Sequence, residues 1–167
     1  VIDAMRLLEA RGVPARFDVY GTGEAEAALA ARAEGLQSVT LHGWVAASDI
    51  SDIMAHSDLG VLPYVRSDFH LSLPNKFVEY LAGGLGVLSC TEGEVRNMIG
   101  ARDCGIWVES APEQIAGSIA ALEPARIKTL KDNARTVFAD TFQQDAVFGK
   151  ALRCLEHLVT DAARTAS

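Results

Sequence analysis

The sequence predicts an α/β domain with a Rossmann-like parallel sheet, helices on both faces, and a helical C-terminal segment. Over residues 1–110, short apolar segments rich in β-branched residues alternate with amphipathic segments of helical periodicity. Strands that alternate with helices form βαβ units and a parallel sheet. The length of 167 residues suits one domain, and 49% hydrophobic residues can supply its core.

The elements follow from local signals along the chain. The predicted strands are 16–21, 39–43, 59–63, 86–90 and 105–109. The predicted helices are 2–11, 24–34, 48–56 and 74–83, and three apolar helical stripes follow Pro112. Gly12 and Gly35 end the first two helices, Ser48 is the expected N-cap of the third, and Pro74 is expected at the first position of the fourth.

The whole chain, 1–167, is predicted to be a single domain. Residues 1–110 form its α/β core and residues 111–167 its C-terminal helices. The chain opens without an initiator methionine, so we expect a fragment of a longer protein.

Charge and composition exclude several classes of function. With 15 basic and 22 acidic residues, the chain lacks the cationic surface of a sequence-independent nucleic-acid binder. No apolar run approaches the roughly 18 residues of a membrane span, and the N-terminus is not a signal peptide. Cys90, Cys104 and Cys154 are far apart, and the histidines lack ligand spacing. We therefore expect a cytoplasmic protein with reduced thiols, no structural metal and no cofactor.

Ligands of doubly wound sheets bind beyond the carboxyl ends of the strands, so functional residues are expected in the loops there. These loops are 21–23, 43–45, 64–73 and 91–94. Gly21 and Gly23 permit a tight turn and close backbone approach to a ligand, although an ordinary βα turn would look the same. A dinucleotide fingerprint needs a third glycine where Glu26 stands, and its acidic ribose-binding residue is also missing, so NAD is disfavoured.

The segment from Leu71 to Gly84 is the most informative. A helix that starts at Pro74 directs the free amides of Asn75 and Lys76 toward the ligand crevice, which suits a phosphate. Lys76 and Glu79 lie three residues apart and share a face, so one can meet phosphate while the other accepts sugar hydroxyls. The alternative is an ordinary surface ion pair, which would stabilise the helix by a few tenths of a kcal/mol. When these two residues are considered alone, this alternative is favoured over a binding site.

Four motifs in consistent order favour the functional interpretation. They are Phe-Asp-Val-Tyr-Gly-Thr-Gly-Glu, Val-Thr-Leu-His-Gly-Trp-Val, Ser-Asp-Leu-Gly-Val-Leu-Pro-Tyr and Leu-Pro-Asn-Lys-Phe-Val-Glu-Tyr-Leu-Ala-Gly-Gly. Over roughly residues 1–125, the chain resembles the C-terminal, donor-binding half of family-four (group 1) retaining glycosyltransferases of GT-B fold. The resemblance implies a hexosyltransferase of glycan or polysaccharide synthesis, which moves a sugar from a UDP- or GDP-linked donor to an acceptor hydroxyl.

The resemblance also implies roles for particular residues, although it assigns no catalytic residue. It places the ribose on Glu79 and the base on the backbone at Trp44 and Val45. It places the diphosphate on the segment Ser72 to Lys76, which includes Leu73 and Asn75, and a glycine turn at Gly21 and Gly23.

The chain departs from the family pattern in two ways. Leu71 stands where the family often has a second glutamate near the donor sugar. The family's phosphate-binding Arg and Lys belong to a strand and loop upstream of Val1, and its acceptor domain lies further upstream. We therefore expect the chain to be inactive alone, and a non-catalytic nucleotide-sugar-binding or assembly module stays open as the alternative.

Other polar groups carry less weight. Asp68 and His70 could reach the donor sugar, but a solvated loop is the favoured interpretation. Lys128, Lys131 and Arg135 share a helical face, which indicates a solvated surface or, more weakly, peripheral attraction to the inner face of a membrane.

Overall fold

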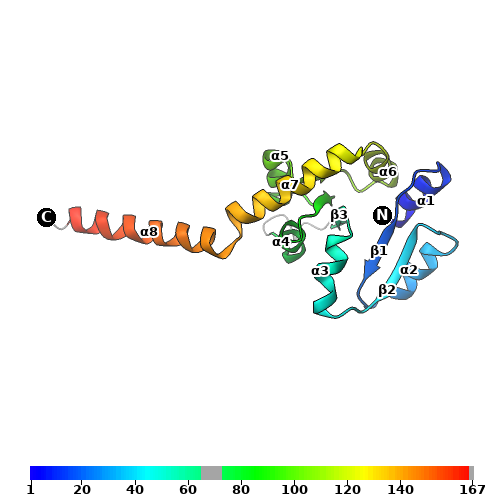
Figure 1. Ribbon diagram of the computed structural model, residues 1–167, viewed down its shortest axis with the longest axis horizontal. Helices are drawn as coiled ribbons and strands as arrows, with labels where there is room; N and C mark the ends of the chain where they lie inside the picture. Colours follow the sequence, from blue (N-terminus) through cyan, green and yellow to red (C-terminus); the bar gives the residue numbers. More distant parts are fainter. Residues whose placement is uncertain (65–72, 166–167) are drawn as a thin grey trace.

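The computed structural model describes residues 1–64 and 73–165, with side chains as far as residue 157. Its strands are β1 (Phe17–Tyr20), β2 (Val39–Gly43), β3 (Leu59–Leu62), β4 (Gly86–Ser89) and β5 (Gly105–Trp107). Its helices are α1 (Ile2–Ala10), α2 (Glu26–Ala33), α3 (Ala47–Ala55), α4 (Asn75–Ala82), α5 (Glu94–Arg102), α6 (Pro112–Ala120), α7 (Pro124–Thr141) and α8 (Gln144–Thr165) (Figure 1). Every predicted strand is present within two residues at each end, and the predicted α/β class is confirmed.

The strands form two parallel sheets rather than the one predicted. β1 pairs with β2, and β4 pairs with both β3 and β5. Helices α2, α4 and α5 connect paired strands as βαβ units, whereas α3 connects β2 of one sheet to β3 of the other. The boundary between the two sheets lies between β1 and β3, which do not pair with each other.

Two apolar clusters cover opposite faces of β4. The α4–α7 cluster consists of Leu62, Phe77, Leu81, Val87, Val95, Ile99, Cys104, Ala134 and Val137. The α1–α6 cluster consists of Ala4, Met5, Leu8, Leu88, Cys90, Val108, Ile115 and Ala116. Neighbouring residues of a strand point to opposite faces, and Val87 and Leu88 accordingly belong to different clusters. Helices on both faces leave all four residues of β4 buried.

Ser48 and Pro74 do not hold the helix positions predicted for them. Ser48 is not the N-cap of α3: Ala46 holds that position, the Asp49 amide donates to its carbonyl, and the Ser48 hydroxyl bonds Asp49. A backbone bond thus closes the first turn without a side-chain cap. Pro74 is the N-cap of α4, with extended φ and ψ of −60° and 140°, so the helix begins one residue later, at Asn75.

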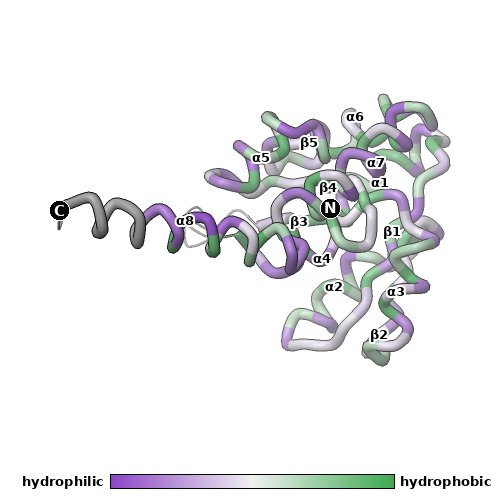
Figure 2. Tube along the Cα trace, turned by 60° about the vertical axis from the view of Figure 1, so that its left-hand side comes forward, coloured by the Kyte–Doolittle hydropathy of each residue, from purple (hydrophilic) through white to green (hydrophobic). Residues whose placement is uncertain are grey.

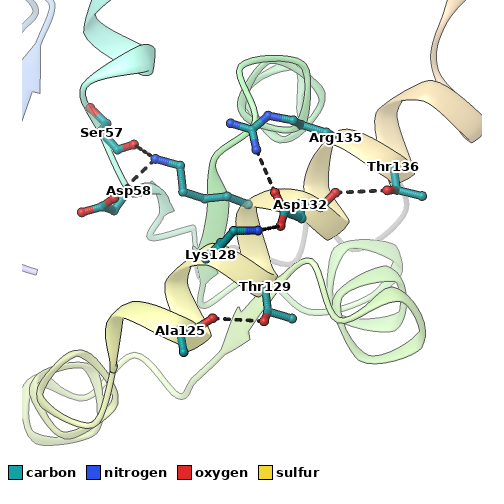
Figure 3. Close-up of polar contacts among 9 residues, drawn as sticks. Ser57, Asp58, Ala125, Lys128, Thr129, Asp132, Arg135 and Thr136 are labelled. Carbon is teal, nitrogen blue, oxygen red and sulfur yellow. Dashed lines mark hydrogen bonds and ion pairs between the residues drawn. The ribbon is translucent and has the colours of Figure 1, made fainter.

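Helix α7 anchors the chain between α3 and β3. The Lys131 ammonium donates to the Ser57 carbonyl at 2.6 Å and lies 3.3 Å from the Asp58 carboxylate (Figure 3). Only 19% of this lysine side chain is exposed. The contact fixes the entry of β3 against the α7 layer.

Helix α8 extends away from the α/β part beyond α7 (Figures 1 and 2). Its apolar stripe includes Phe148, Leu152 and Leu155, each more than half exposed. These residues recur at helical spacing, but packing does not bury them.

Candidate functional site

A backbone hydrogen bond joins the loops that follow β1 and β2. The Gly21 amide donates to the Gly43 carbonyl at 2.6 Å, which joins the start of the glycine turn to the residue before Trp44. Gly21 and Gly43 have positive φ values of 121° and 72°, which glycine adopts without steric cost. The structure thus brings together the residues predicted for the glycine turn and the base contact.

Space is open at this pair of loops. A Cβ atom at Gly23 would have no neighbour within 4 Å, and its φ is not positive, so the backbone does not require glycine there. The Trp44 side chain is 73% exposed. Both observations allow a ligand to approach, and both also fit an ordinary exposed turn.

The N-terminus of α4 offers free amides. The Phe77 amide donates to the Pro74 carbonyl at 2.9 Å, and no side chain caps the helix within the described residues. The first amides of a helix lack intrahelical partners, which leaves those of Asn75 and Lys76 to meet solvent or ligand. The helix dipole adds partial positive charge at this end.

Lys76 and Glu79 pair on the exposed face of the first turn of α4. The ammonium donates to the carboxylate at 2.7 Å, with 51% and 45% of the two side chains exposed. The predicted shared face is therefore present. An exposed pair of this kind contributes less than about 1 kcal/mol to stability, so exchange of its partners for a ligand costs little.

The remaining residues predicted on this segment divide into two groups. Leu73 is half-buried and packs against the α4–α7 cluster, so its side chain contributes to the core. Ser72 lies outside the described residues, as do Asp68, His70 and Leu71.

Polar groups that the sequence did not single out lie at the end of β4. The Cys90 amide donates to the Leu62 carbonyl at 3.0 Å, which holds the ends of β3 and β4 together. Ser89 and Thr91 are buried, and the Ser89 hydroxyl accepts a bond from the Thr91 amide at 3.0 Å. Within the described residues, the Thr91 hydroxyl has no partner. In the sequence, the change from apolar to hydroxyl side chains at the end of this strand could have pointed to Ser89 and Thr91.

Glu92, in the loop after β4, is held in an ion pair. Its carboxylate accepts from Arg96 at 2.9 Å, and the Arg96 guanidinium lies 3.7 Å above the centroid of the Trp107 ring. This stack orders the loop between β4 and α5.

A second polar group lies on β1 and β2. His42 Nε2 lies 2.6 Å from one Asp18 oxygen, Arg16 Nε donates to the other at 2.8 Å, and Tyr20 stacks on the His42 ring at 4.4 Å. Burial raises the pKa of Asp18, but the bonds from Arg16 and His42 outweigh it and hold the pKa below its ordinary value. The group borders a cavity of about 300 Å³, whose lining residues are Arg16, Asp18, Tyr20, Asp52, Ile53, His56 and Ser57.

The cysteines have two kinds of surroundings. Cys90 and Cys104 are buried, and burial raises the pKa of both thiols, whereas Cys154 is exposed on α8. The two buried residues behave as small apolar side chains of the clusters, as isolated cysteines usually do.

The basic residues of α7 are paired with acids. Lys128 and Arg135 contact Asp132 at 2.5 and 3.2 Å, and Lys131 contacts Asp58 (Figure 3). Lys128 and Arg135, whose side chains are 78% and 56% exposed, fit the predicted solvated face, whereas Lys131, which is 19% exposed, does not. Within residues 1–64 and 73–165, no helix is long and apolar enough to cross a membrane. In the same part of the chain, no cluster of three or more His, Cys, Asp or Glu residues could hold a metal ion.

Comparison with known proteins defines the class of the domain. The glycosyltransferase WaaG, which is involved in lipopolysaccharide biosynthesis, matches with a TM-score of 0.69 and 21% identity over 90% of this chain, which shows a shared fold. The chain spans 41% of the length of that structure. The family described as "Glycosyl transferases group 1" matches residues 1–123, and the chain belongs to this family. The curated proteins yield no match.

Proposed function

We propose that this chain is the donor-binding half of a retaining glycosyltransferase. The observation that carries the proposal is the start of α4, where no side chain among the described residues caps the helix at Asn75 and Lys76, and where Lys76 and Glu79 lie on one exposed face. Free amides at a helix N-terminus bind anions such as phosphate. Membership of the group 1 glycosyl transferases supports a nucleotide-sugar donor and an acceptor as the substrates.

Each part of the site has one role in donor binding. The amides of Asn75 and Lys76 hold the diphosphate, and the Lys76 ammonium turns from Glu79 toward it. The Glu79 carboxylate then accepts hydrogen bonds from the ribose hydroxyls, which are good donors to an ionised acceptor. The backbone at Trp44 and Val45 contacts the base, UDP and GDP being the two candidates.

Positive charge at the start of α4 also favours the reaction. As the sugar leaves, negative charge develops on the departing diphosphate. Fixed amides and a cation placed there stabilise that charge without reorganisation of the protein. Sugar transfer further requires an acceptor-binding part, so the 167 residues alone are proposed to be inactive. The reaction is proposed to serve glycan or polysaccharide synthesis in the cytoplasm or at the inner membrane face.

A second candidate is a non-catalytic nucleotide-sugar-binding module. Leucine at position 71, in place of a family glutamate, favours it because leucine cannot hydrogen-bond a donor sugar. Turnover measurements on the complete gene product separate the two candidates, since both bind the nucleotide but only one transfers sugar.

Calorimetry with UDP and with GDP on the complete protein tests the site. Glu79→Ala is expected to weaken binding roughly ten- to hundredfold, since a hydrogen bond to a charged group is worth about 1.5–3 kcal/mol. Glu113→Ala, which removes an exposed carboxylate from the first turn of α6, is the matched control and should leave affinity unchanged. Unchanged dissociation constants for both nucleotides in Glu79→Ala would refute the ribose assignment.

A further inference from the structure

The ring of Tyr80, on α4, packs against the main chain of β3 at Gly60. A Cβ atom at Gly60 would lie 2.2 Å from Cγ of the ring and 2.3 and 2.7 Å from its two Cδ atoms. Non-bonded carbon atoms pack at about 3.5–4.0 Å, so the ring fills the space that any other side chain would need. Gly60 is buried and its φ is not positive, so the close approach of Tyr80, and not the backbone conformation, requires glycine here.

Tyr80 stands between the buried and the exposed sides of α4. Phe77 and Leu81 are buried, whereas Lys76 and Glu79 are exposed. Lys76 lies four residues before Tyr80, which makes the two neighbours on successive turns, and Glu79 directly precedes Tyr80. The rotation of α4 that seats the ring on Gly60 is therefore also the rotation that directs Lys76 and Glu79.

The phenol of Tyr80 lies near the candidate site without carrying charge. Burial raises the pKa of Tyr80, and the neighbouring Tyr64 phenol and Glu79 carboxylate raise it further. Tyr64 follows the carboxyl end of β3, the edge at which ligands of such sheets bind. The phenol stays protonated near neutral pH, so it does not repel a nucleotide diphosphate.

The other close contacts of α4 constrain its rotation less. Phe77 and Leu81 insert into the α4–α7 cluster, where apolar attraction is non-directional. A Cβ atom at Gly83 would lie 2.5 Å from the sulfur of Met54 on α3, and a methionine side chain adapts easily. The Tyr80 ring, by contrast, turns about only two side-chain bonds, and the ladder with β4 fixes the main chain beneath it.

We propose that Tyr80 is a positioning residue for donor binding, whose ring, seated on Gly60, sets the rotation of α4 and so holds Lys76 and Glu79 toward the nucleotide. The inference rests on the proposed function, since it assigns no ligand contact to Tyr80 itself. Binding groups must be held within about 0.5 Å and 10–20° of the productive geometry. The ring supplies such support to two side chains that are about half exposed and pair with each other.

Calorimetry with UDP and with GDP on the complete protein tests this role. Tyr80→Ala is expected to weaken nucleotide binding about fivefold or more, whereas Tyr80→Phe, which keeps the ring on Gly60, should stay within about twofold of the unsubstituted protein. The matched control is Phe138→Ala, which removes a half-buried ring that packs against the same cluster from α7. The control should lower stability and leave the affinity unchanged, which separates positioning from a general loss of stability.

A double substitution tests whether the contact with Gly60 is the cause. Gly60→Ala displaces the ring and should weaken nucleotide binding by a similar factor. In Gly60→Ala/Tyr80→Ala the new methyl group occupies space that the ring has left, so the affinity should be no lower than in Tyr80→Ala alone. Losses that multiply overturn the proposal, because they mean that the two residues act separately. Gly60→Ala keeps every side chain of α4, so it carries the test if Tyr80→Ala does not fold.

Glu79→Ala separates failure of this inference from failure of the proposed function. In the Glu79→Ala background, Tyr80→Ala should weaken binding by a smaller factor than in the unsubstituted protein, because one of the two groups that it positions is gone. An equal factor overturns the positioning of Glu79. If Glu79→Ala leaves both affinities unchanged, the proposed function is refuted and this inference falls with it. If Glu79→Ala weakens binding and Tyr80→Ala does not, only this inference is overturned.

Discussion

The β1–β2 sheet and the β3–β4–β5 sheet are both parallel, yet they differ in burial. All four residues of β4 are buried, whereas β1 and β2 contain half-buried or exposed residues only. The connecting helices differ in the same way: α4 and α5 bury Phe77, Leu81, Val95 and Ile99, and α2 and α3 bury nothing. A parallel strand is fully buried only when it has neighbours on both edges and helices on both faces, a condition that β4 meets and β1 does not.

The largest expected difference between the two sheets is at their phenylalanines. Phe77 is completely buried in the α4–α7 cluster, whereas Phe17 of β1 is half-buried. Phe77→Ala should cost about 3–5 kcal/mol because it removes apolar contacts and leaves a cavity. Phe17→Ala should cost clearly less. Urea unfolding of both variants measures the difference in the free energy of unfolding. Equal losses for the two variants would contradict the claim that the two sheets differ in burial.

Glycine-to-alanine substitutions test how closely the two sheets are packed. A Cβ at Gly60 of β3 would lie 2.2 Å from the Tyr80 ring, whereas one at Gly23 meets nothing within 4 Å. Gly60→Ala should destabilise by about 1–3 kcal/mol because the ring must move. Gly23→Ala should have no measurable effect on thermal unfolding. If Gly60→Ala is as stable as the unsubstituted protein, the Tyr80 ring of α4 can move away from β3 at little cost, which would contradict this prediction.

The lysines of α7 test how this helix is held against the β3–β4–β5 sheet. Lys131 is 19% exposed and bonds the chain just before β3, whereas Lys128 is 78% exposed and bonds Asp132 on its own helix. Lys131→Met should cost about 1–2 kcal/mol, since it leaves the Ser57 carbonyl without its charged donor. Lys128→Met should cost less than about 0.5 kcal/mol. The prediction fails if chemical denaturation ranks the two variants the other way.

The smallest effect is expected at Asp18, in the β1–β2 sheet. Its folded pKa lies below its unfolded value, so its ionised form stabilises the fold. This contribution is complete above the unfolded pKa, about 3.9, and is lost as the pH falls through the lower folded pKa. With 21% of the side chain exposed, Asp18→Asn should cost less than about 1 kcal/mol at pH 7. The difference from the unsubstituted protein should shrink when unfolding is repeated near pH 3, and a constant difference would mean that the charge is not the cause.

Much of the site follows from rules that act over a few residues. Lys76 and Glu79 share a face because three residues make nearly one helical turn. The amides at the start of α4 lack intrahelical acceptors because of helix geometry, and Pro74 marks in the sequence where the helix begins. The Asp18–His42 pair was missed because it depends on strand register: Asp18 lies opposite Thr40, and no local pattern states that pairing.

The sequence by itself determined the α/β class, the five strands and, to within one residue, the start of α4, since each depends on periodicity, glycine or proline within a short segment. Only the tertiary structure decided which edges pair. The division of the described strands into two sheets results from contacts between segments far apart in the chain. The tertiary structure also decided which apolar helix stripes are buried. Leu130, Ala134 and Val137 of α7 are buried, whereas Phe148, Leu152 and Leu155 of α8 stay exposed, because a stripe is buried only where another layer meets it.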